Sequence, residues 1–300
     1  LKQIEDELHK WAPIRQLLTQ SKDPLFTHFF VQNTVAEKQT AYLRGMEITD
    51  EVAGIDERLS KLDLLWLDEQ RRTMNWAHVV PGMLHPSGTM QAAGSSYNWM
   101  INQLCQNERT LAAQSGRSVF ELIDEQIISS PIGANKLLFL PYMLGERTPR
   151  WNVDAKGAFI GLTLGHTHGD MLRAVMEGIT LNLGFIVNIF RKHVPIDQVT
   201  VIGGCAQNPI WRQMMADIYQ AEIRVPNYLE EATSMGAAIL AGIGAGIFKD
   251  FSVIDRFVRI EQTVQPIPEN VKKYEAWMPV FDQAYHALCE MYTEIAKTEL

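Results

Sequence analysis

The sequence reads Val199-Thr-Val-Ile-Gly-Gly-Cys-Ala-Gln-Asn-Pro209 where a predicted strand passes into a predicted helix. The apolar run at its start predicts the strand. Gly203 and Gly204 predict a tight turn, because glycine adopts backbone conformations that other residues avoid. Asn208 followed by proline is typical of a helix start, with a capping side chain and then a proline in the first turn. The stretch therefore predicts one strand–turn–helix unit of an α/β fold.

The alternation of strand and helix continues on both sides of this stretch. Before it, apolar patterns predict a strand over 158–163 and a helix over 170–190. After it, they predict a helix over 209–219, a strand over 223–225 and a helix over 234–245. Such alternation is typical of a central sheet flanked by helices, so we expect an α/β domain.

Upstream, a different pattern begins at Thr73. There β-prone residues lead to the turn dipeptide Pro81-Gly82, which predicts a strand pair. A helix is then predicted over 95–106. Ser118 and Glu121 match a capping box, in which each residue satisfies a backbone amide of the other, ahead of a further helix. We expect the domain boundary to fall between residues 72 and 73.

Three other segments have a clear pattern. Residues 1–72 show helical spacing of apolar residues and contain no catalytic motif that we recognise, so we expect a mostly helical segment of unknown function. The apolar run 137–140 predicts a short buried strand. A last helix over 269–295 carries an aromatic face that we expect to dock on the sheet. This face consists of Tyr274, Trp277, Phe281, Tyr285 and Tyr292.

Composition excludes several classes of function. The 300 residues are 46% hydrophobic and carry a formal net charge of -8, which disfavours binding to nucleic acid or to an anionic membrane surface. No uninterrupted apolar run reaches the roughly 18 residues of a membrane span. The three cysteines lack paired spacing, so we expect neither disulfides nor zinc, and a cytoplasmic location. The chain begins with Leu1, which suggests a processed or incomplete product.

Two motifs admit a structural interpretation that competes with a functional one. Gly203 and Gly204 either form only a tight turn, with Asn208 only as a cap, or present bare backbone to a flat ring or ribose. Gly242-Ile-Gly244-Ala-Gly246 looks like a dinucleotide motif but lies within a predicted helix, so we expect it to permit close packing. His166 and His168 lack further ligands nearby in sequence, and we expect solvated loop histidines and no metal site.

A longer motif gives the chain a specific resemblance. The sequence reads Gly157-Ala-Phe-Ile-Gly-Leu162, then seven residues, then Asp170-Met-Leu-Arg-Ala-Val-Met-Glu177. This resembles the second signature of the FGGY family of carbohydrate kinases at every constrained position. The stretches 141–149 and 88–99 also resemble family segments, and the latter is most similar to xylulokinases. The resemblance runs without apparent gaps from about residue 70 to residue 298.

The resemblance implies a fold and a nucleotide site. Members of the FGGY family have a ribonuclease H-like, actin-like ATPase domain with a central mixed sheet. The resemblance therefore implies that residues 73–300 form the C-terminal nucleotide-binding domain. In related kinases, residues at the positions of Gly203, Gly204 and Asn208 hold adenosine. Residues at the positions of Gly94 and Asn98 approach the ATP phosphates or ribose. The resemblance thus implies ATP or ADP as ligand, with Mg²⁺ accompanying the nucleotide but without an identified protein ligand.

The catalytic part of the family pattern is not found. Residues 1–72 contain neither Asp-x-Gly-Thr nor Gly-Asp-Gln, the family motifs for the phosphates and the catalytic base, so we assign no catalytic residue. We expect a sugar kinase acting most plausibly on D-xylulose, of which this chain supplies the nucleotide half, with the sugar bound only where a catalytic half is present. The alternatives are a non-catalytic nucleotide-binding or interaction module, and a fragment whose exposed domain interface promotes homo-oligomers.

Overall fold

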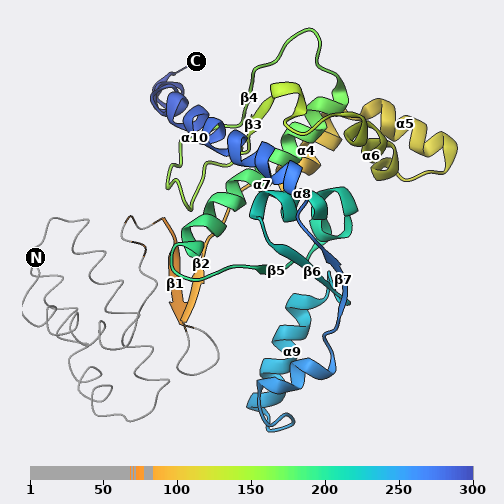
Figure 1. Cartoon of the computed structure of the whole chain (residues 1–300), viewed down its shortest axis with the longest axis vertical. Helices are drawn as coiled ribbons and strands as arrows, with labels where there is room; N and C mark the ends of the chain where they lie inside the picture. The colour runs from red at the N-terminus through yellow and green to blue at the C-terminus, as the bar shows by residue number, and fades with distance from the viewer. Residues whose placement is uncertain (1–67, 69, 71, 78–83, 300) are drawn as a thin grey trace, which may run out of the picture. The chain divides into compact units, whose positions relative to one another are not determined.

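The computed structural model describes residues 68, 70, 72–77 and 84–299 (Figure 1). The chain divides into two compact units, of which the second, Gly88–Leu300, holds all the predicted site residues. The predicted helical segment over residues 1–72 lies almost entirely outside the described residues, so it stays a prediction. So does the domain boundary between residues 72 and 73.

The predicted strand pair is confirmed in the first unit. β1 (Met74–Ala77) pairs antiparallel with β2 (Leu84–Ser87), in a register that places Met74 opposite Ser87. The turn dipeptide between the two strands lies outside the described residues. The hairpin forms its own two-stranded sheet.

The second unit is built from helices and short strands. Its first half contains α4 (Gly94–Leu104), α5 (Gln106–Ser115), α6 (Val119–Ser129), β3 (Leu138–Leu140), β4 (Ala158–Ile160) and α7 (His168–Arg191). Its second half contains β5 (Gln198–Thr200), α8 (Pro209–Tyr219), β6 (Glu222–Pro226), α9 (Ala232–Gly244), β7 (Ile260–Val264) and α10 (Pro268–Lys297). The predicted helix over 209–219 matches α8 at both ends. Its start was predictable because Asn208 and Pro209 are a cap and a first-turn proline.

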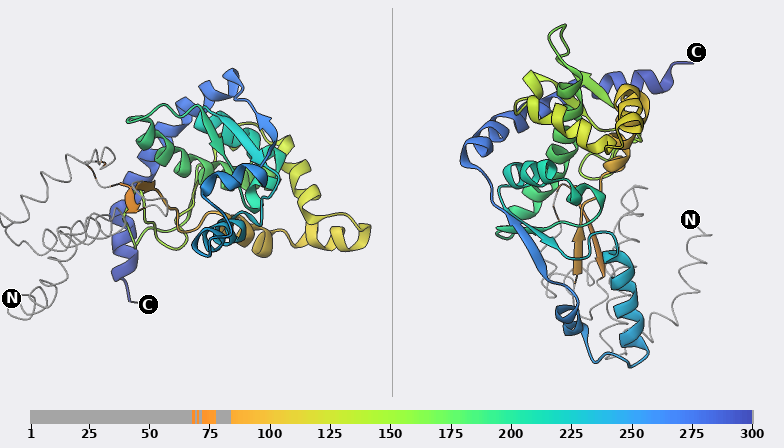
Figure 2. Two further views of the ribbon diagram at one scale, coloured as in Figure 1. Left: turned by 90° about the horizontal axis from the view of Figure 1, so that it is seen from below. Right: turned by 90° about the vertical axis from the view of Figure 1, so that its right-hand side faces the viewer.

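Within the second unit the strands form a three-stranded mixed sheet and a separate pair, which are labelled in Figure 1. β5 runs parallel to β6, and β7 runs antiparallel to β6, which gives the three-stranded order β5-β6-β7. β3 and β4 pair antiparallel with each other. The predicted α/β class with a mixed sheet is therefore confirmed. Figure 2 shows α9 projecting from this sheet away from the other helices of the unit.

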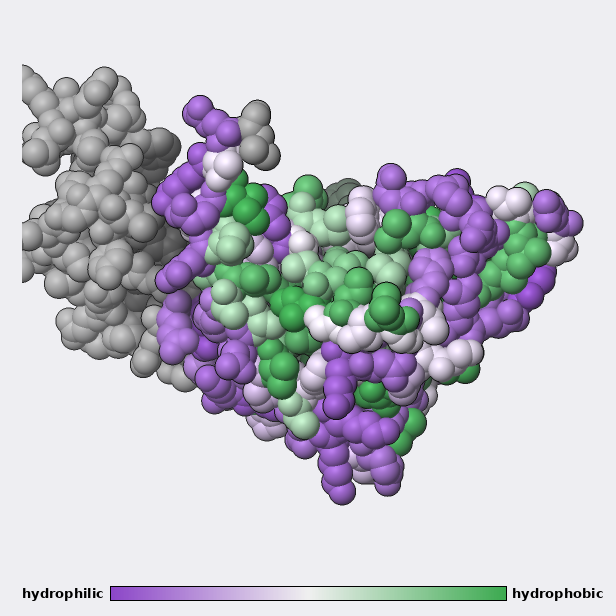
Figure 3. Space-filling view, turned by 90° about the horizontal axis from the view of Figure 1, so that it is seen from above, coloured by the Kyte–Doolittle hydropathy of each residue, from purple (hydrophilic) through white to green (hydrophobic). Residues whose placement is uncertain are grey.

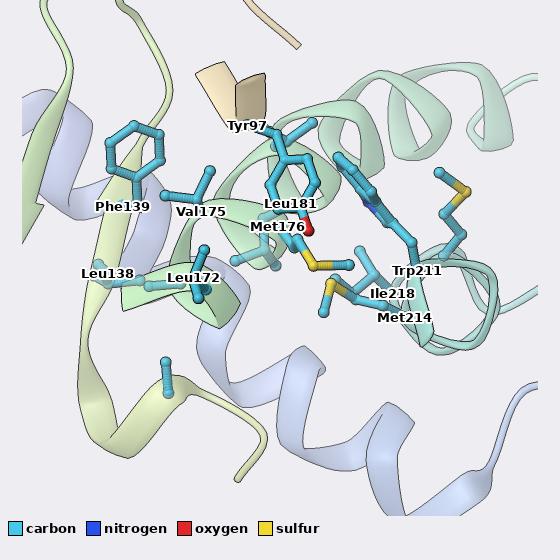
Figure 4. Close-up of a cluster of buried hydrophobic side chains, with 14 of the residues drawn as sticks. Tyr97, Leu138, Phe139, Leu172, Val175, Met176, Leu181, Trp211, Met214 and Ile218 are labelled. Carbon is cyan, nitrogen blue, oxygen red and sulfur yellow. The ribbon is translucent and has the colours of Figure 1, made fainter. Parts of the chain in front are cut away.

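Helix α7 forms the centre of the hydrophobic core. It contacts α4, α6, α8 and β3, and Figure 4 shows its side chains packed between those of β3 and α8. By length and composition α7 could cross a membrane, which the sequence pattern did not predict because charged residues interrupt its apolar stretch. However, 72% of that stretch is buried inside the protein. The helix is apolar because neighbouring elements cover it.

The aromatic face of the last helix is buried as predicted, but the helix packs mainly on α8 and reaches the strands at β3, not at the mixed sheet. In α10 the side chains of Tyr274, Phe281, Tyr285 and Tyr292 are buried, while Trp277 is half-buried. Aromatic contacts extend the interface, since Tyr285 packs edge-on against Tyr142 with ring centroids 5.2 Å apart. The helix contacts α7, α8 and β3, so it covers part of the core.

The capping box expected at Ser118 was only partly right. Ser118 caps α6 by accepting a hydrogen bond from the Phe120 amide at 3.2 Å, but no bond returns from Glu121, whose carboxylate faces Arg117 at 3.6 Å. A complete capping box stands at the start of α7, where Thr167 and Asp170 exchange side-chain and backbone hydrogen bonds. Glu121 therefore does not complete the capping box, and its carboxylate lies near the Arg117 guanidinium instead.

The close packing expected at the glycines of α9 is confirmed only at Gly242. A side chain at Gly242 would lie 2.4 Å from the Phe248 ring, so glycine is needed for close packing at this position. Gly244 meets nothing within 4 Å and Gly246 lies beyond the helix end in a left-handed conformation. The resemblance to a dinucleotide motif is thus without structural basis, because the glycines lie in and after a helix and not after a strand.

Candidate nucleotide-binding site

The turn after β5 presents bare backbone at the carboxyl end of a strand. Gly203 has φ +86° and ψ 178°, a region that only glycine occupies readily. Its amide donates to the Leu229 carbonyl at 2.8 Å, and its carbonyl accepts from the Ala206 amide at 3.0 Å. A Cβ placed on Gly203 or on Gly204 would meet no protein atom within 4 Å. The space above both glycines is therefore open, and a flat ligand could approach the backbone there.

The loop between β6 and α9 lies beside this turn. Two hydrogen bonds join the loop to the turn. The Gly203 amide donates to the Leu229 carbonyl, and Gln207 Nε2 donates to Glu230 Oε1 at 2.6 Å. Ile202, directly before the first glycine, is 52% exposed. An apolar side chain exposed next to an open glycine turn offers a surface on which an aromatic base could pack.

Asn208 holds the far end of the turn and caps α8. Its Oδ1 accepts hydrogen bonds from the amides of Ile210 at 2.8 Å and Trp211 at 3.1 Å. Its Nδ2 donates to Asp124 Oδ1 of α6 at 2.8 Å. The capping role predicted from the sequence is confirmed. The side-chain amide keeps one N–H with which it could donate to a ligand.

Replacement of Asn208 is expected to affect stability as well as binding. Asn208→Ala removes the cap and leaves Asp124 without this donor, so we expect the free energy of unfolding to fall by about 1–2 kcal/mol. Asn208→Ser keeps an oxygen that can cap the helix and should lose less. Urea unfolding of both variants checks this. Equal losses in the two variants would contradict the capping explanation.

The start of α4 lies beside the glycine turn. Gly94 is the first residue of α4, and a Cβ placed there would lie 3.6 Å from Cys205 Sγ. One turn further on, Tyr97 packs edge-on against Trp211 of α8, with ring centroids 5.1 Å apart. The structure therefore places Gly94 next to Cys205, the residue that follows the two glycines. No side chain caps α4, and a free helix N-terminus favours anions such as phosphate.

A buried loop fixes the segment that leads into α4. Glu146 accepts hydrogen bonds from the Gln91 amide at 2.9 Å and from Asn182 Nδ2 at 3.0 Å. Thr148 donates to the Thr89 carbonyl at 2.9 Å. Burial raises the pKa of Glu146, although hydrogen bonds from the Gln91 and Arg147 amides oppose this. Glu146 and Thr148, which belong to the stretch 141–149 that resembles a family segment, thus position Gly94 and need not touch a ligand themselves.

Asn98 lies one helical turn after Gly94 and faces solvent. It lines an open pocket of about 560 Å³ formed by α4, α5 and α6, whose other lining residues include Arg109, Arg117 and Phe120. None of the other four predicted site residues lines this pocket. A contact between Asn98 and a nucleotide therefore stays a prediction.

Two acidic residues of the family signature are buried and hydrogen-bonded. Asp170 accepts from Ser130 Oγ at 2.6 Å and from Asn135 Nδ2 at 2.8 Å, besides its bonds in the capping box. Burial would raise the pKa of Asp170, but these hydrogen bonds outweigh it and the pKa lies below the usual value. Glu177 accepts from Arg173, Tyr274 and the Gly133 amide. Both carboxylates hold the fold together around α7.

The two histidines differ from the solvated loop residues that we expected. His166 is half-buried, and its ring nitrogens lie 2.9 Å from the Thr163 amide and 3.2 Å from the Asn135 carbonyl oxygen. His168 is the first residue of α7 and contacts two side chains from the α4–α5 segment. The prediction was wrong for His168, because its partners Glu108 and Cys105 lie 60 and 63 positions earlier in the sequence.

Comparison with known families identifies the family to which the chain belongs. Residues 65–245 match the family model described as "FGGY family of carbohydrate kinases, C-terminal domain". The chain belongs to the FGGY family of carbohydrate kinases. The match spans the glycine turn, the cap at Asn208 and the start of α4, so all five predicted site residues lie inside the FGGY region.

Curated FGGY relatives cover the same part of the chain. A xylulose kinase from Staphylococcus epidermidis is 39% identical over 211 residues, which are 69% of this chain and 40% of the relative. A gluconokinase from Bacillus licheniformis is 33% identical over 211 residues, which are 70% of this chain and 41% of the relative. The chain thus spans about two fifths of the length of these FGGY kinases.

A solved structure supports the FGGY fold. The ligand-bound xylulose kinase from Lactobacillus acidophilus superposes with a TM-score of 0.66 at 24% identity, over 76% of this chain and 44% of that one. This likeness agrees with the mixed sheet and the helices around it. The second unit therefore has the actin-like ATPase fold expected for an FGGY domain.

Proposed function

We propose that this chain supplies the nucleotide-binding part of an ATP-dependent sugar kinase and that residues 73–300 form its nucleotide-binding domain. The observation that carries the proposal is the open backbone of Gly203 and Gly204 at the carboxyl end of β5, beside the uncapped start of α4. Open sheets place ligands at the carboxyl ends of strands, and bare glycine backbone admits a base or ribose. The positive end of α4 favours the phosphates of ATP or ADP.

The reaction proposed for the complete protein is transfer of the γ-phosphoryl group of ATP to a sugar hydroxyl. D-xylulose is the sugar we favour, since the relative with 39% identity is named a xylulose kinase. Another relative, 33% identical over 211 residues, is named a gluconokinase, so this part of the chain is also similar to a kinase named for a different substrate. We assign no catalytic base in this chain and no ligand for the accompanying Mg²⁺. The groups that act on the phosphoryl are proposed to lie outside this nucleotide domain.

A second candidate is a non-catalytic nucleotide-binding module, which could act as a homo-oligomer. It is favoured by the lack of Asp-x-Gly-Thr and Gly-Asp-Gln in residues 1–72. Figure 3 shows apolar side chains gathered on one face of the second unit, where a partner or a further domain could pack. We place either form in the cytoplasm, where ATP is abundant. Release of ADP from ATP that depends on added D-xylulose would rule the second candidate out.

Binding of ADP to the full chain is the direct test. We expect isothermal titration with ADP to show one site per chain, and Gly204→Val to weaken it at least about tenfold by filling the space where the base or ribose lies. Because a Cβ at Gly204 meets no protein atom, the variant should unfold at a temperature close to that of the wild type.

Gly244→Val is the matched control, because it adds the same side chain at an exposed glycine of α9 that meets nothing within 4 Å. It should bind ADP like the wild type. Absence of heat at millimolar ADP with the wild-type chain, or equal weakening by the two variants, would overturn the assignment of the site.

A further inference from the structure

Three side chains of different chemistry meet where α4, α5 and α7 come together. Cys105 lies between α4 and α5, Glu108 lies in the first turn of α5, and His168 begins α7. His168 Nδ1 lies 3.0 Å from Glu108 Oε1, and His168 Nε2 lies 3.7 Å from Cys105 Sγ. One ligand atom from each residue lies within 4.8 Å of the other two. The cluster is distinct from the glycine turn, since none of its residues belongs to that site.

The cluster contains a buried polar atom without a partner. The side chain of Glu108 is 10% exposed, and its Oε2 has no hydrogen-bond partner, while its Oε1 also accepts from Gln126 Nε2 at 2.7 Å. An unpaired carboxylate oxygen in a buried position is unfavourable, because the oxygen has lost its hydration without gaining a protein donor. A cation bound between the three side chains would satisfy it.

The donor set and its spacing suit a tetrahedral metal ion. Thiolate, imidazole and carboxylate are the ligands of Zn²⁺ in proteins, with bonds of about 2.0–2.3 Å that place ligand atoms roughly 3.3–3.8 Å apart. The sulfur–nitrogen separation of 3.7 Å already falls in this range. The remaining separations are at most 4.8 Å, so they must shorten by up to about 1.5 Å to close the site. Glu108 must also leave its contact with His168 Nδ1 to reach an ion bound by Nε2.

We propose that Cys105, Glu108 and His168 form a binding site for a thiophilic divalent cation, with Zn²⁺ as the fitting ion and water in the fourth position. The thiol proton leaves to solvent as the metal–sulfur bond forms, so thiolate and carboxylate together balance the charge of the ion. The His168 side chain is 29% exposed, which gives a route for the ion to a cysteine that is itself fully buried.

The alternative of a cysteine nucleophile activated by the histidine is disfavoured. Cys105 is 0% exposed, so no substrate carbon can reach its sulfur without unpacking α4. Burial raises the pKa of the Cys105 thiol to about 11, with the Glu108 charge as a second cause. A thiol held in its protonated form is a poor nucleophile. A metal ion can displace the proton where a substrate could not enter.

The bound ion would join α4 and α5 to α7. Cys105 closes the end of α4 opposite to Gly94, and α7 is the central core helix. An ion that binds only the folded chain stabilises it by an amount that grows with the ratio of its concentration to its Kd. The site is independent of the proposed function, because it needs no nucleotide.

Titration of the metal-free full chain with Zn²⁺ tests the proposal. We expect one ion per chain and a higher melting temperature in its presence. With Co²⁺ as the probe, a thiolate-to-metal absorption band should appear in the near ultraviolet. Cys105→Ser should abolish this band and weaken Zn²⁺ binding by at least about 10–100-fold, and Glu108→Gln should weaken it by a similar factor.

Cys289→Ser and His166→Gln are the matched controls, since each removes a cysteine or histidine outside the cluster and should leave Zn²⁺ binding unchanged. His168→Gln, at a half-exposed position, gives a second variant should Cys105→Ser fail to fold, as circular dichroism would report. No Co²⁺ band in the wild type, or Zn²⁺ binding that Cys105→Ser and Cys289→Ser weaken equally, would overturn the site.

Discussion

Glu177→Ala is expected to lower the free energy of unfolding by about 3–5 kcal/mol, the cost of breaking a buried ion pair from one side. The Glu177 side chain is 2% exposed and that of Arg173 is 11% exposed. Glu177 Oε1 accepts from Arg173 Nε at 2.8 Å, from the Tyr274 hydroxyl at 2.9 Å and from the Gly133 amide at 3.0 Å. The alanine variant leaves all three donors without this acceptor and leaves a guanidinium charge buried.

Urea unfolding of a small set of variants checks this expectation. Burial raises the pKa of Glu177, with Arg173 opposing it. Glu177→Gln keeps an oxygen that can accept from the same three donors but still leaves the guanidinium charge unpaired, so it should lose less than the alanine variant. Glu275→Ala removes an exposed glutamate from α10 and should change stability by less than about 0.5 kcal/mol. A loss for Glu177→Ala as small as that of this control would contradict the buried network.

The role of the signature acids shows what the sequence could and could not predict. Their spacing within one segment identified the family, since the pattern is local. Their function as buried acceptors could not be predicted, because the donors come from other segments, such as Tyr274 at 97 positions further on. The same holds for Asp170, because its donor Ser130 lies 40 positions earlier in the sequence. A family signature here marks residues that hold the core, while the open glycines lie elsewhere.

The strand and helix prediction succeeded where end signals are local. Asn208 and a proline defined the start of α8, and the aromatic spacing of α10 defined its buried face. The prediction failed at Glu121, whose carboxylate lies 3.6 Å from Arg117 and makes no bond to the Ser118 amide. The length of the strands was overestimated at 158–163, since β4 ends at Ile160, before Gly161 with φ +93°.

The residues of the candidate sites also differ in whether a local sequence signal marks them. The glycine turn is a contiguous motif, so its residues could be predicted from the sequence. Asp124, which holds Asn208, carries no local signal, because its partner lies 84 positions later. The sequence predicted no metal site at His168, because Glu108 lies 60 positions away from it. The fold brings the junction of α4 and α5 next to the start of α7, and the three side chains meet there.

Gly178→Ala is expected to destabilise the chain by about 2–3 kcal/mol although alanine favours helices. Gly178 lies in the middle of α7, and a Cβ there would lie 2.1 Å from the Phe139 carbonyl oxygen of β3. This neighbour is backbone of a fully buried strand, so it cannot rotate away, and α7 and β3 must separate. Overpacking of this kind outweighs the gain of about 1 kcal/mol that alanine brings to a helix interior.

The matched control is Gly236→Ala in α9, where a new Cβ would meet nothing within 4 Å. Helix propensity then acts alone, and we expect this variant to be more stable than the wild type by about 0.5–1 kcal/mol. Urea unfolding of both variants measures the two effects with the same chemical change. Opposite signs would show that contact between α7 and β3, and not glycine as such, sets the requirement at Gly178. Stabilisation of both would mean that α7 and β3 can separate at little cost, contrary to the close packing described above.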